Sequence, residues 1–370
     1  LRRINGILPI TSSLRKKYSK IILPEVNKDE AVLVKDISVI PAETLKHLIF
    51  HFKKEKSLPI YYKRFKIQAP DNYENDFANI KGQEQAKRAL EIAAAGDHNV
   101  FFIGPPGSGK TLLARTLPTI LPNLCDEEIL EVTKIYSVAG LLPMDNPIVG
   151  IRPFRAPHHT ASSVALVGGG TFPRPGEITL AHRGVLFMDE FAEFPRSVLE
   201  ALRQPLEDGI VTVSRAQGSI TYPAQFILVA AQNPCPCGYL GDQNKSCICT
   251  PTQIMRYQKR VSGPLLDRID IHVEVPRVKY EKLASEIVAE ESVKIRERVQ
   301  NARGIQQNRL AKTNSEMSPK EIKEHCQLDE KSKDSKKILE ALKNIKENCL
   351  NKRGIAIITM PLGYNPEMDR

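Results

Sequence analysis

The sequence predicts an α/β fold, in which a parallel β-sheet carries helices on both faces. Three short apolar runs at residues 99–103, 185–188 and 226–231 are typical of buried strands. Helical patterns at residues 83–95 and 195–207 alternate with these runs, and such alternation favours a doubly wound parallel sheet. A glycine-rich loop directly follows the first apolar run and opens a further helical pattern.

The composition is that of an ordinary globular protein. The 370 residues are 41% hydrophobic and 26% charged, which allows two or three domains. No apolar run approaches the roughly 18 residues of a membrane span, and the N-terminus lacks a signal-peptide pattern. We therefore expect a cytoplasmic protein with no membrane partner. The net charge of +10 is compatible with a polyanion partner, although much of it is scattered lysine. Because the first residue is Leu1 rather than Met, the chain is expected to be a fragment or a processed product.

Residues 1–54 are expected to form a small α+β domain. The expected elements are strands at residues 4–10, 21–23 and 37–40 and a helix at residues 41–52. Residues 55–76 contain prolines and many polar residues, and we interpret them as a linker.

The α/β core is expected to span residues 77–277, and residues 278–370 form a mostly helical, lysine-rich part. Within the core, residues 148–176 are dense in glycine and proline and are predicted to be an insertion or a long loop. Residues 210–222 have the make-up of a β-hairpin with turn residues at its tip.

The glycine-rich loop matches the pattern of phosphate-binding loops. Its residues are Gly104, Pro105, Pro106, Gly107, Ser108, Gly109, Lys110 and Thr111. The glycines let consecutive backbone N–H groups curve around an anion, and the following helix adds the partial positive charge of its N-terminus. Lys110 is placed to reach the β- and γ-phosphates, and Thr111 is placed to bind Mg²⁺. The loop therefore predicts a nucleotide site.

Two carboxylates, Asp189 and Glu190, directly follow the apolar run 185–188. Because α/β sheets place their ligands at the carboxyl ends of the strands, both side chains are expected beside the phosphate loop. Asp189 is placed to hold Mg²⁺ through water, and Glu190 is placed to orient and deprotonate an attacking water. The alternative interpretation is an acidic cap on the following helix. Together with the loop, the carboxylates favour a nucleotide hydrolase.

A polar amide, Asn233, ends the next apolar run. At the end of a strand of the nucleotide sheet, it is placed to hydrogen-bond the attacking water or the γ-phosphate. An asparagine before proline is also a common turn residue, which is the alternative interpretation of Asn233.

Several longer segments add specific residue combinations to these motifs. They include Gly82-Gln-Glu-Gln-Ala-Lys-Arg88, Arg152-Pro-Phe-Arg-Ala-Pro-His-His-Thr160, Pro175-Gly-Glu-Ile-Thr-Leu-Ala-His182, Asn233-Pro-Cys-Pro-Cys-Gly238 and Ser262-Gly-Pro-Leu-Leu-Asp-Arg-Ile-Asp270. In combination they resemble the AAA+ ATPases, and among these the YifB/ComM family of magnesium-chelatase-like proteins. The resemblance covers roughly residues 1–330.

This resemblance implies an AAA+ P-loop fold with a helical lid, and a homo-hexameric ring with ATP and Mg²⁺ between subunits. Arg268 matches the family's arginine finger, which would reach the γ-phosphate of the neighbouring subunit. An ion pair with Asp267 or Asp270 is the alternative role for Arg268.

The two ends of the chain depart from what the resemblance implies. The N-terminal part looks like the tail end of a Lon-protease-like domain, but Leu8 occupies the aligned position of the catalytic lysine. The serine-bearing part of such a domain would lie upstream of Leu1, so no Ser–Lys pair can be argued from these residues and we expect no peptidase activity. After Ile322 the family's arginine-bearing helix is not recognisable, and Arg353 cannot be assigned the sensor role. The lid is therefore expected to be atypical or truncated.

The hairpin at residues 210–222 resembles the pore-lining hairpin of minichromosome-maintenance helicases, which carries a basic residue that grips DNA. Arg215 is the matching position, and one arginine per subunit around a ring would give sequence-independent binding. An ordinary surface hairpin is the alternative. In the 148–176 segment, Arg152 and Arg155 are further candidate DNA contacts. His158 and His159 are expected to make structural hydrogen bonds.

Four cysteines form two close pairs, Cys235 with Cys237 and Cys247 with Cys249, nine residues apart. Four thiolates could meet at one tetrahedral Zn²⁺ across such a loop, although the usual spacing has two or more residues inside each pair. Free thiols are the alternative interpretation.

The function that the residues and the resemblance imply is an ATP-driven ring motor that acts on single-stranded or branched DNA in recombination or natural transformation. Two alternatives remain open at this point: a chelatase-type motor that remodels a protein partner, and a nucleotide-binding module with impaired hydrolysis.

Overall fold

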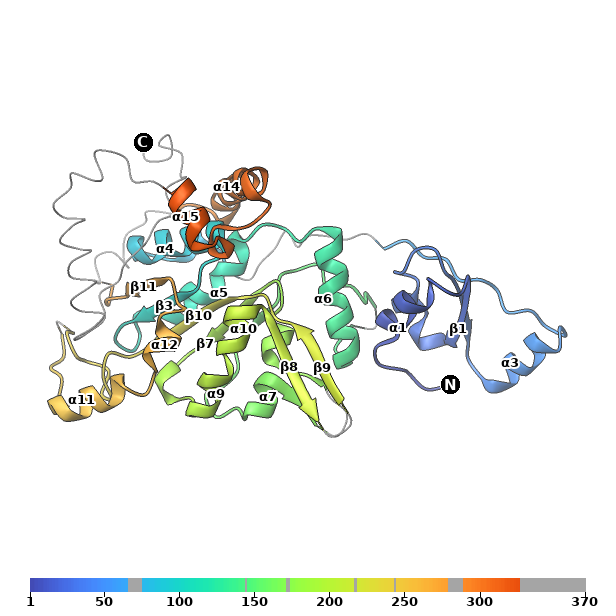
Figure 1. Cartoon of the computed structure of the whole chain (residues 1–370), viewed down its shortest axis with the longest axis horizontal. Coiled ribbons are helices and arrows are strands. Elements are labelled where there is room, and N and C mark those ends of the chain that lie inside the picture. The colour runs from blue at the N-terminus through green and yellow to red at the C-terminus, as the bar shows by residue number, and fades with distance from the viewer. Residues whose placement is uncertain are drawn as a thin grey trace.

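The computed structural model describes residues 1–65, 75–143, 145–170, 174–215, 218–242, 244–278 and 289–326 of the chain. Figure 1 shows a larger α/β part and a smaller N-terminal part, with helix α6 (Asp126–Ala139) at their junction. Within the described ranges, we find no helix with the length and apolar character that a membrane crossing requires.

A five-stranded sheet forms the centre of the α/β part. Its strands are β3 (Val100–Ile103), β4 (Phe154–Arg155), β7 (Val185–Met188), β10 (Ile227–Gln232) and β11 (Ile271–Glu274). All pairings are parallel, and the spatial order is β11, β3, β10, β7, β4. The parallel α/β sheet expected from three apolar runs is therefore confirmed, and β4 and β11 add its two edges.

Helices cover both faces of this sheet. Side chains of β3 alternate between two cores, because Val100 and Phe102 lie in one core and Phe101 lies in the other. The first core is closed by α4 (Glu84–Gly96), α5 (Lys110–Ile120) and α14 (Ser292–Leu310). The second is closed by α7 (Ser163–Val167), α8 (Glu177–Leu180), α9 (Arg196–Ala201), α11 (Pro251–Gln258) and α12 (Gly263–Leu266). Burial on both faces explains why the strands are continuously apolar in sequence.

The helices predicted at residues 83–95 and 195–207 are present. The second of them is divided into α9 and α10 (Arg203–Asp208). Helix α6 was not anticipated, although Asp126 and two glutamates in its first turn are typical of a helix N-terminus.

The segment 148–176 is not only an insertion or a loop, and this corrects the sequence-based expectation. It contains β4, which pairs with β7 at the edge of the central sheet. It also contains α7 and a short antiparallel pair, β5 (Gly168–Gly169) with β6 (Arg174–Pro175). Strands of two residues are too short to show a hydrophobic period, so the sequence pattern could not reveal them.

The predicted hairpin is confirmed as an antiparallel pair, β8 (Ile210–Arg215) with β9 (Gly218–Pro223). It projects beside α7 and α9 in Figure 1. Its inner side chains, Val211 and Val213, are buried in the second core.

The N-terminal part contains a parallel pair, β1 (Lys20–Pro24) with β2 (Ser38–Ala42), and the helices α1 (Ile7–Leu14), α2 (Lys28–Ala31) and α3 (Leu45–Phe52). The strand expected at residues 4–10 is wrong, because this segment turns at Gly6 (φ 77°) into α1. Gly6 N–H donates to Ser137 O of α6 at 3.0 Å, which joins the two parts. The expected linker begins inside this domain, since Tyr61 N–H donates to Val39 O of β2 at 2.8 Å.

The described end of the chain is helical, as expected. Helix α14 packs on α4, where Arg298 forms an ion pair with Glu91 at 2.8 Å. Helix α15 (Pro319–His325) begins with a capping box of Ser318 and Glu321. Arg353 lies outside the described residues.

Candidate functional site

The phosphate loop joins β3 to α5 at the carboxyl edge of the sheet. Gly107 and Gly109 adopt the left-handed conformation, with φ of 77° and 90°, and an added Cβ at either position would meet no atom within 4 Å. The requirement for glycine at these two positions is therefore conformational. At Gly104 the requirement is space, because a Cβ would lie 2.1 Å from Val275 O.

The Lys110 ammonium lies inside the loop. Its Nζ donates to Gly104 O at 2.7 Å, to Pro105 O at 2.9 Å and to Asn233 Oδ1 at 3.3 Å. Burial lowers the pKa of Lys110, and the Asp189 carboxylate opposes this shift. The structure thus brings Asn233 and Lys110 together, as the predicted location of Asn233 at a strand end requires.

The second strand end completes this edge. Thr111 Oγ1 donates to Asp189 Oδ2 at 2.9 Å, and Glu190 N–H donates to Asp189 Oδ1 at 2.9 Å. A hydroxyl and a carboxylate side by side are the oxygen donors that Mg²⁺ prefers. We call the group of Lys110, Thr111, Asp189, Glu190 and Asn233 the sheet-edge site.

A phosphate group fits this cradle. The Ser108 hydroxyl oxygen is buried and has no hydrogen-bond partner among the described residues. Most buried polar groups in proteins have a hydrogen-bond partner, so the Ser108 hydroxyl is a donor that a bound phosphate would satisfy. The ammonium group of Lys110 is buried, and the space beside Gly107 and Gly109 is open. Both features suit an anionic ligand.

Glu190 has a contact that the sequence analysis missed. His159 Nδ1 lies 2.8 Å from Glu190 Oε2, and both side chains are partly exposed. His158 makes the structural hydrogen bond expected for it, to Thr160 Oγ1 at 2.8 Å. His159 instead contacts the candidate general base. Because β4 and β7 are parallel neighbours, the residues that follow their carboxyl ends lie close together. The sequence could not predict this contact, because it did not reveal β4.

Glu190 also has an unusual backbone conformation. Its φ of 52° lies in the left-handed region, which a glutamate rarely adopts. Backbone strain of this kind costs on the order of 1–3 kcal/mol and is concentrated at functional sites. The hydrogen bond from Glu190 N–H to Asp189 Oδ1 holds this backbone conformation, and the His159 contact holds the side chain.

Arg268 lies between α12 and β11. It forms an ion pair with Glu207 of α10 and donates from Nη1 to Pro264 O at 2.7 Å. It therefore does not pair with Asp267 or Asp270, the partners considered from the sequence. Asp270 instead lies 3.1 Å from His98 Nδ1.

The three candidate DNA contacts, Arg152, Arg155 and Arg215, differ in the contacts that they make within the chain. Arg152 donates to Pro122 O at 2.5 Å and to Arg183 O at 2.7 Å, and Arg155 binds Glu177 through two hydrogen bonds of 2.6 and 2.7 Å. Both guanidinium groups therefore have acceptors inside the chain, and a DNA contact by either of them stays a prediction. Arg215 ends β8 at the hairpin tip, and its side chain lies outside the described residues.

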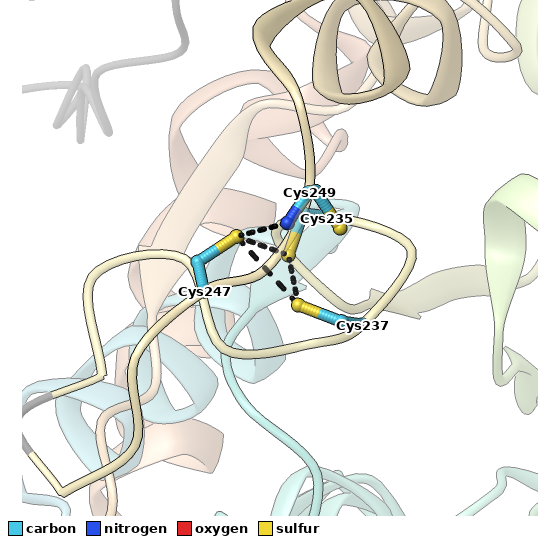
Figure 2. Close-up of side chains that lie close together, drawn as sticks. All are labelled: Cys235, Cys237, Cys247 and Cys249. Atoms are coloured by element: carbon cyan, nitrogen blue, oxygen red, sulfur yellow. Dashed lines mark hydrogen bonds between the residues drawn. The ribbon is translucent and has the colours of Figure 1, made fainter.

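The four cysteines come together in the loop after β10 (Figure 2). Cys235 Sγ lies 3.4 Å from Cys237 Sγ and 3.7 Å from Cys247 Sγ, and the latter two sulfurs are 3.6 Å apart. All four sulfurs, including that of Cys249, lie within 4.8 Å of one another. Zn–S bonds of about 2.3 Å in a tetrahedron place sulfurs about 3.8 Å apart. The cluster therefore has the donor set and the spacing to bind a metal ion.

The environment of Cys237 favours the thiolate form. Hydrogen bonding to the backbone of Tyr239 lowers the pKa of the Cys237 thiol to about 6, although desolvation opposes the shift. At Cys247, a backbone hydrogen bond to Cys249 is outweighed by desolvation and the neighbouring thiols, which raise the pKa to about 12. Thiolates are the form of cysteine that binds metals.

A pocket of about 690 Å³ lies between α4 and the start of α14. Ile80, Gly82 and Glu290 are among the residues that line it. Gln83, next to Gly82, donates through Nε2 to Ser108 O of the loop at 3.0 Å. The pocket thus lies one residue from a side chain that contacts the phosphate loop, but its lining contains no residue of the sheet-edge site.

The fold and the sheet-edge site define a class. A parallel α/β sheet that presents a glycine loop, a lysine and two carboxylates at its carboxyl edge is a P-loop nucleotide-binding domain. The family model "Magnesium chelatase, subunit ChlI" matches residues 76–283, and "Magnesium chelatase, subunit ChlI C-terminal" matches residues 289–356. The chain belongs to the magnesium-chelatase family of AAA+ proteins.

Similar proteins come from bacteria and from algae. The chain is 43% identical over 364 residues to Competence protein ComM of Haemophilus influenzae, which covers 96% of the chain and 68% of that protein. It is 41% identical over 331 residues to Uncharacterized protein YifB of Escherichia coli, covering 89% of the chain and 64% of that protein. It is 25% identical over 293 residues to the magnesium-chelatase subunit ChlI of Euglena gracilis, covering 73% of the chain and 72% of the subunit.

These matches confirm the YifB/ComM resemblance and correct its extent. The similarity covers nearly the whole chain instead of ending near residue 330, and the C-terminal family model reaches residue 356. The chain spans about two thirds of the length of these two bacterial relatives.

Proposed function

We propose that the chain is an ATP-hydrolysing motor subunit that works in a ring and acts on DNA. The observation that carries the ATPase proposal is the convergence of Lys110, Thr111, Asp189, Glu190 and Asn233 at one sheet edge. The family implies a nucleotide and Mg²⁺ at this edge.

Each residue has a role that its contacts support. Lys110 exchanges the carbonyl oxygens of the loop for phosphate oxygens, and Ser108 and the loop N–H groups add donors. Thr111 and Asp189 hold Mg²⁺, which neutralises charge on the phosphates when it is bound. Glu190 accepts the proton of the attacking water, and His159 holds the Glu190 carboxylate in place.

Arg268 is proposed to act on the ATP of a neighbouring subunit. Its guanidinium is only partly exposed and is neutralised by Glu207 in the single chain. Hydrolysis is therefore expected to depend on assembly, and a comparison of turnover per chain in dilute and concentrated protein tests this expectation. Equal turnover at all concentrations would contradict the finger role.

We propose DNA as the substrate of the motor for two reasons, the position of the β8–β9 hairpin and the name of a similar protein. The β8–β9 hairpin projects from the core with Arg215 at its tip, and the relative that matches 96% of the chain is named a competence protein. That name and the family resemblance support a proposed role in recombination or natural transformation. The alternative is a chelatase-type motor that remodels a protein, which the similarity to the Euglena subunit supports at lower identity.

DNA-stimulated ATP hydrolysis tests the proposal. We expect single-stranded or branched DNA to increase turnover, and we expect Arg215→Ala to weaken DNA binding in a salt-dependent assay. Turnover that is insensitive to DNA, together with unchanged DNA binding by Arg215→Ala, would favour the protein-remodelling alternative. ATP binding without turnover would indicate the nucleotide-binding module.

We also propose that the cysteine cluster binds Zn²⁺ in a reducing cytoplasm. Four thiolate donors close a tetrahedral structural site, and Zn²⁺ is the common ion in such sites. Metal analysis of the purified chain is expected to give about one zinc per chain, and a content far below one would contradict the site.

A further inference from the structure

The cysteine loop is packed directly on the phosphate loop. Gly238 lies between the two thiol pairs with φ of +83°, and a Cβ at this position would lie 2.7 Å from Pro106 Cδ. Gly238 N–H also donates to Cys235 O at 2.9 Å, which fixes the glycine next to the first ligand. Gly238 therefore brings the cysteine loop into tight contact with the phosphate loop.

A second connection runs through Arg277, which follows β11. Its Nη2 donates to Pro106 O at 3.4 Å, and its Nε lies 3.1 Å from Asp242 Oδ2 in the cysteine loop. The guanidinium carbon lies 5.6 Å from the centre of the Tyr239 ring, within the range of a cation–π contact. Arg277 thus joins the cysteine loop and the phosphate loop to the same strand end.

A third connection is covalent. Asn233, whose Oδ1 accepts from Lys110 Nζ, precedes the first cysteine by two residues, and Cys235 is fully buried. Whatever fixes Cys235 also limits where the Asn233 side chain can lie. Without a metal, the thiols offer only weak hydrogen bonds to hold this loop.

We propose that a metal ion bound by the four thiolates positions Asn233 and Pro106, so that the nucleotide site is fully formed only in the metal-bound chain. This inference rests on the proposed nucleotide and zinc sites and adds a coupling between them. Four metal–sulfur bonds fix the loop that contacts Pro106, in the way that metal sites commonly stabilise a local fold. The cysteines are then positioning residues for ATP binding and hydrolysis.

Reversible metal removal tests the coupling. The purified chain is treated with a zinc-selective chelator in excess Mg²⁺, zinc is quantified, and binding of a fluorescent ATP analogue is titrated. We expect the loss of zinc to weaken analogue binding and to lower turnover about tenfold or more, because small displacements in a site have such effects. Added Zn²⁺ is expected to restore both. Unchanged binding and turnover in the metal-free chain would overturn the coupling.

A pair of glycine variants separates the contact from the metal. Gly238→Ala keeps all four thiols but places a Cβ against Pro106, whereas Gly241→Ala imposes the same left-handed strain (φ +80°) with no atom within 4 Å. We expect both variants to retain one zinc per chain, and only Gly238→Ala to weaken analogue binding. Equal nucleotide binding by the two variants would contradict transmission through Pro106.

The proposal and its premises fail in different ways. If the zinc-loaded chain does not bind the ATP analogue, the nucleotide site itself is wrong, and the coupling falls with it. If the chain binds the analogue but contains no zinc as purified and gains none on addition, the metal site is wrong. If both ligands bind and metal removal changes neither nucleotide affinity nor turnover, only the coupling is wrong.

Discussion

The sheet-edge site and the cysteine cluster are neighbours, but different kinds of structure hold their residues in place. The sheet-edge residues follow parallel strands whose backbone hydrogen bonds fix their positions. The cysteines lie in a loop whose described residues form no strand or helix between β10 and α11, and the first of them, Cys235, is fully buried. The sheet thus forms the sheet-edge site by its topology, whereas we propose that the cysteine loop is held in shape by a bound ion.

The largest effect that sharpens this comparison is expected from Glu190→Gln. The amide keeps the shape of the side chain but cannot accept the proton, so ATP binding is retained and turnover falls about 10²- to 10⁴-fold. Single-turnover hydrolysis and equilibrium binding measured on the same preparation check this prediction. Unchanged turnover would remove Glu190 from the role of base.

Lys110→Ala is expected to act on binding. The variant loses a charged donor to the phosphates, which weakens ATP-analogue binding by about 10- to 100-fold. Lys259→Ala, at the C-terminal cap of α11, is a matched control that is expected to bind normally. Equal affinity of the two variants would mean that Lys110 does not contact the nucleotide.

Cys237→Ser is expected to affect the loop more than the sheet. Removing one of four ligands weakens zinc binding, and the midpoint of thermal unfolding then no longer rises with added Zn²⁺. Cys125→Ser, at an exposed thiol outside the cluster, is the control that keeps the zinc-dependent rise. A rise that persists in Cys237→Ser would place the metal elsewhere.

His159→Ala tests a contact from a loop to the sheet-edge site. Without the imidazole the Glu190 carboxylate is less well positioned, so kcat is expected to fall about tenfold while nucleotide affinity stays the same. His159→Gln, which can still donate a hydrogen bond, is expected to recover part of the rate. A parallel loss of kcat and of affinity would indicate a general structural role for His159.

The smallest effect is expected from Arg155→Ala. Its ion pair with Glu177 is partly exposed, so the variant is destabilised by about 1 kcal/mol, as measured by denaturant unfolding. DNA binding is expected to stay unchanged, in contrast to Arg215→Ala. Weakened DNA binding by Arg155→Ala with unchanged stability would support the DNA contact that the sequence suggested for Arg155.

The parts of the fold that could be predicted were those with long or unbroken signals. The runs 99–103, 185–188 and 226–231 are buried on both faces, and each became a strand of the sheet. The order of these strands then placed Lys110 and Asn233 at one edge. At this edge, the local motif and the sheet topology both predicted that Lys110 and Asn233 lie close together.

Other parts depended on contacts that are distant in sequence. Strand β4 has two residues and no period of its own, so its neighbour His159 could not be connected to Glu190. Arg152 and Arg155 were interpreted from charge alone, whereas their acceptors lie on α6, α8 and loops that only the fold brings near. Residues 4–10 are apolar enough for a strand, but Gly6 and packing on α6 select a helix.

In the single chain, the proposed arginine finger, Arg268, is held and neutralised by its ion pair with Glu207. In the proposed ring, Arg268 reaches the neighbouring nucleotide only by leaving one anionic partner for another. The exchange releases Glu207 as an unpaired carboxylate at the moment the subunits engage. The exchange leaves the net charge of each interface unchanged, but it moves the unpaired negative charge from the nucleotide to Glu207. Salt is therefore expected to affect subunit assembly through this carboxylate.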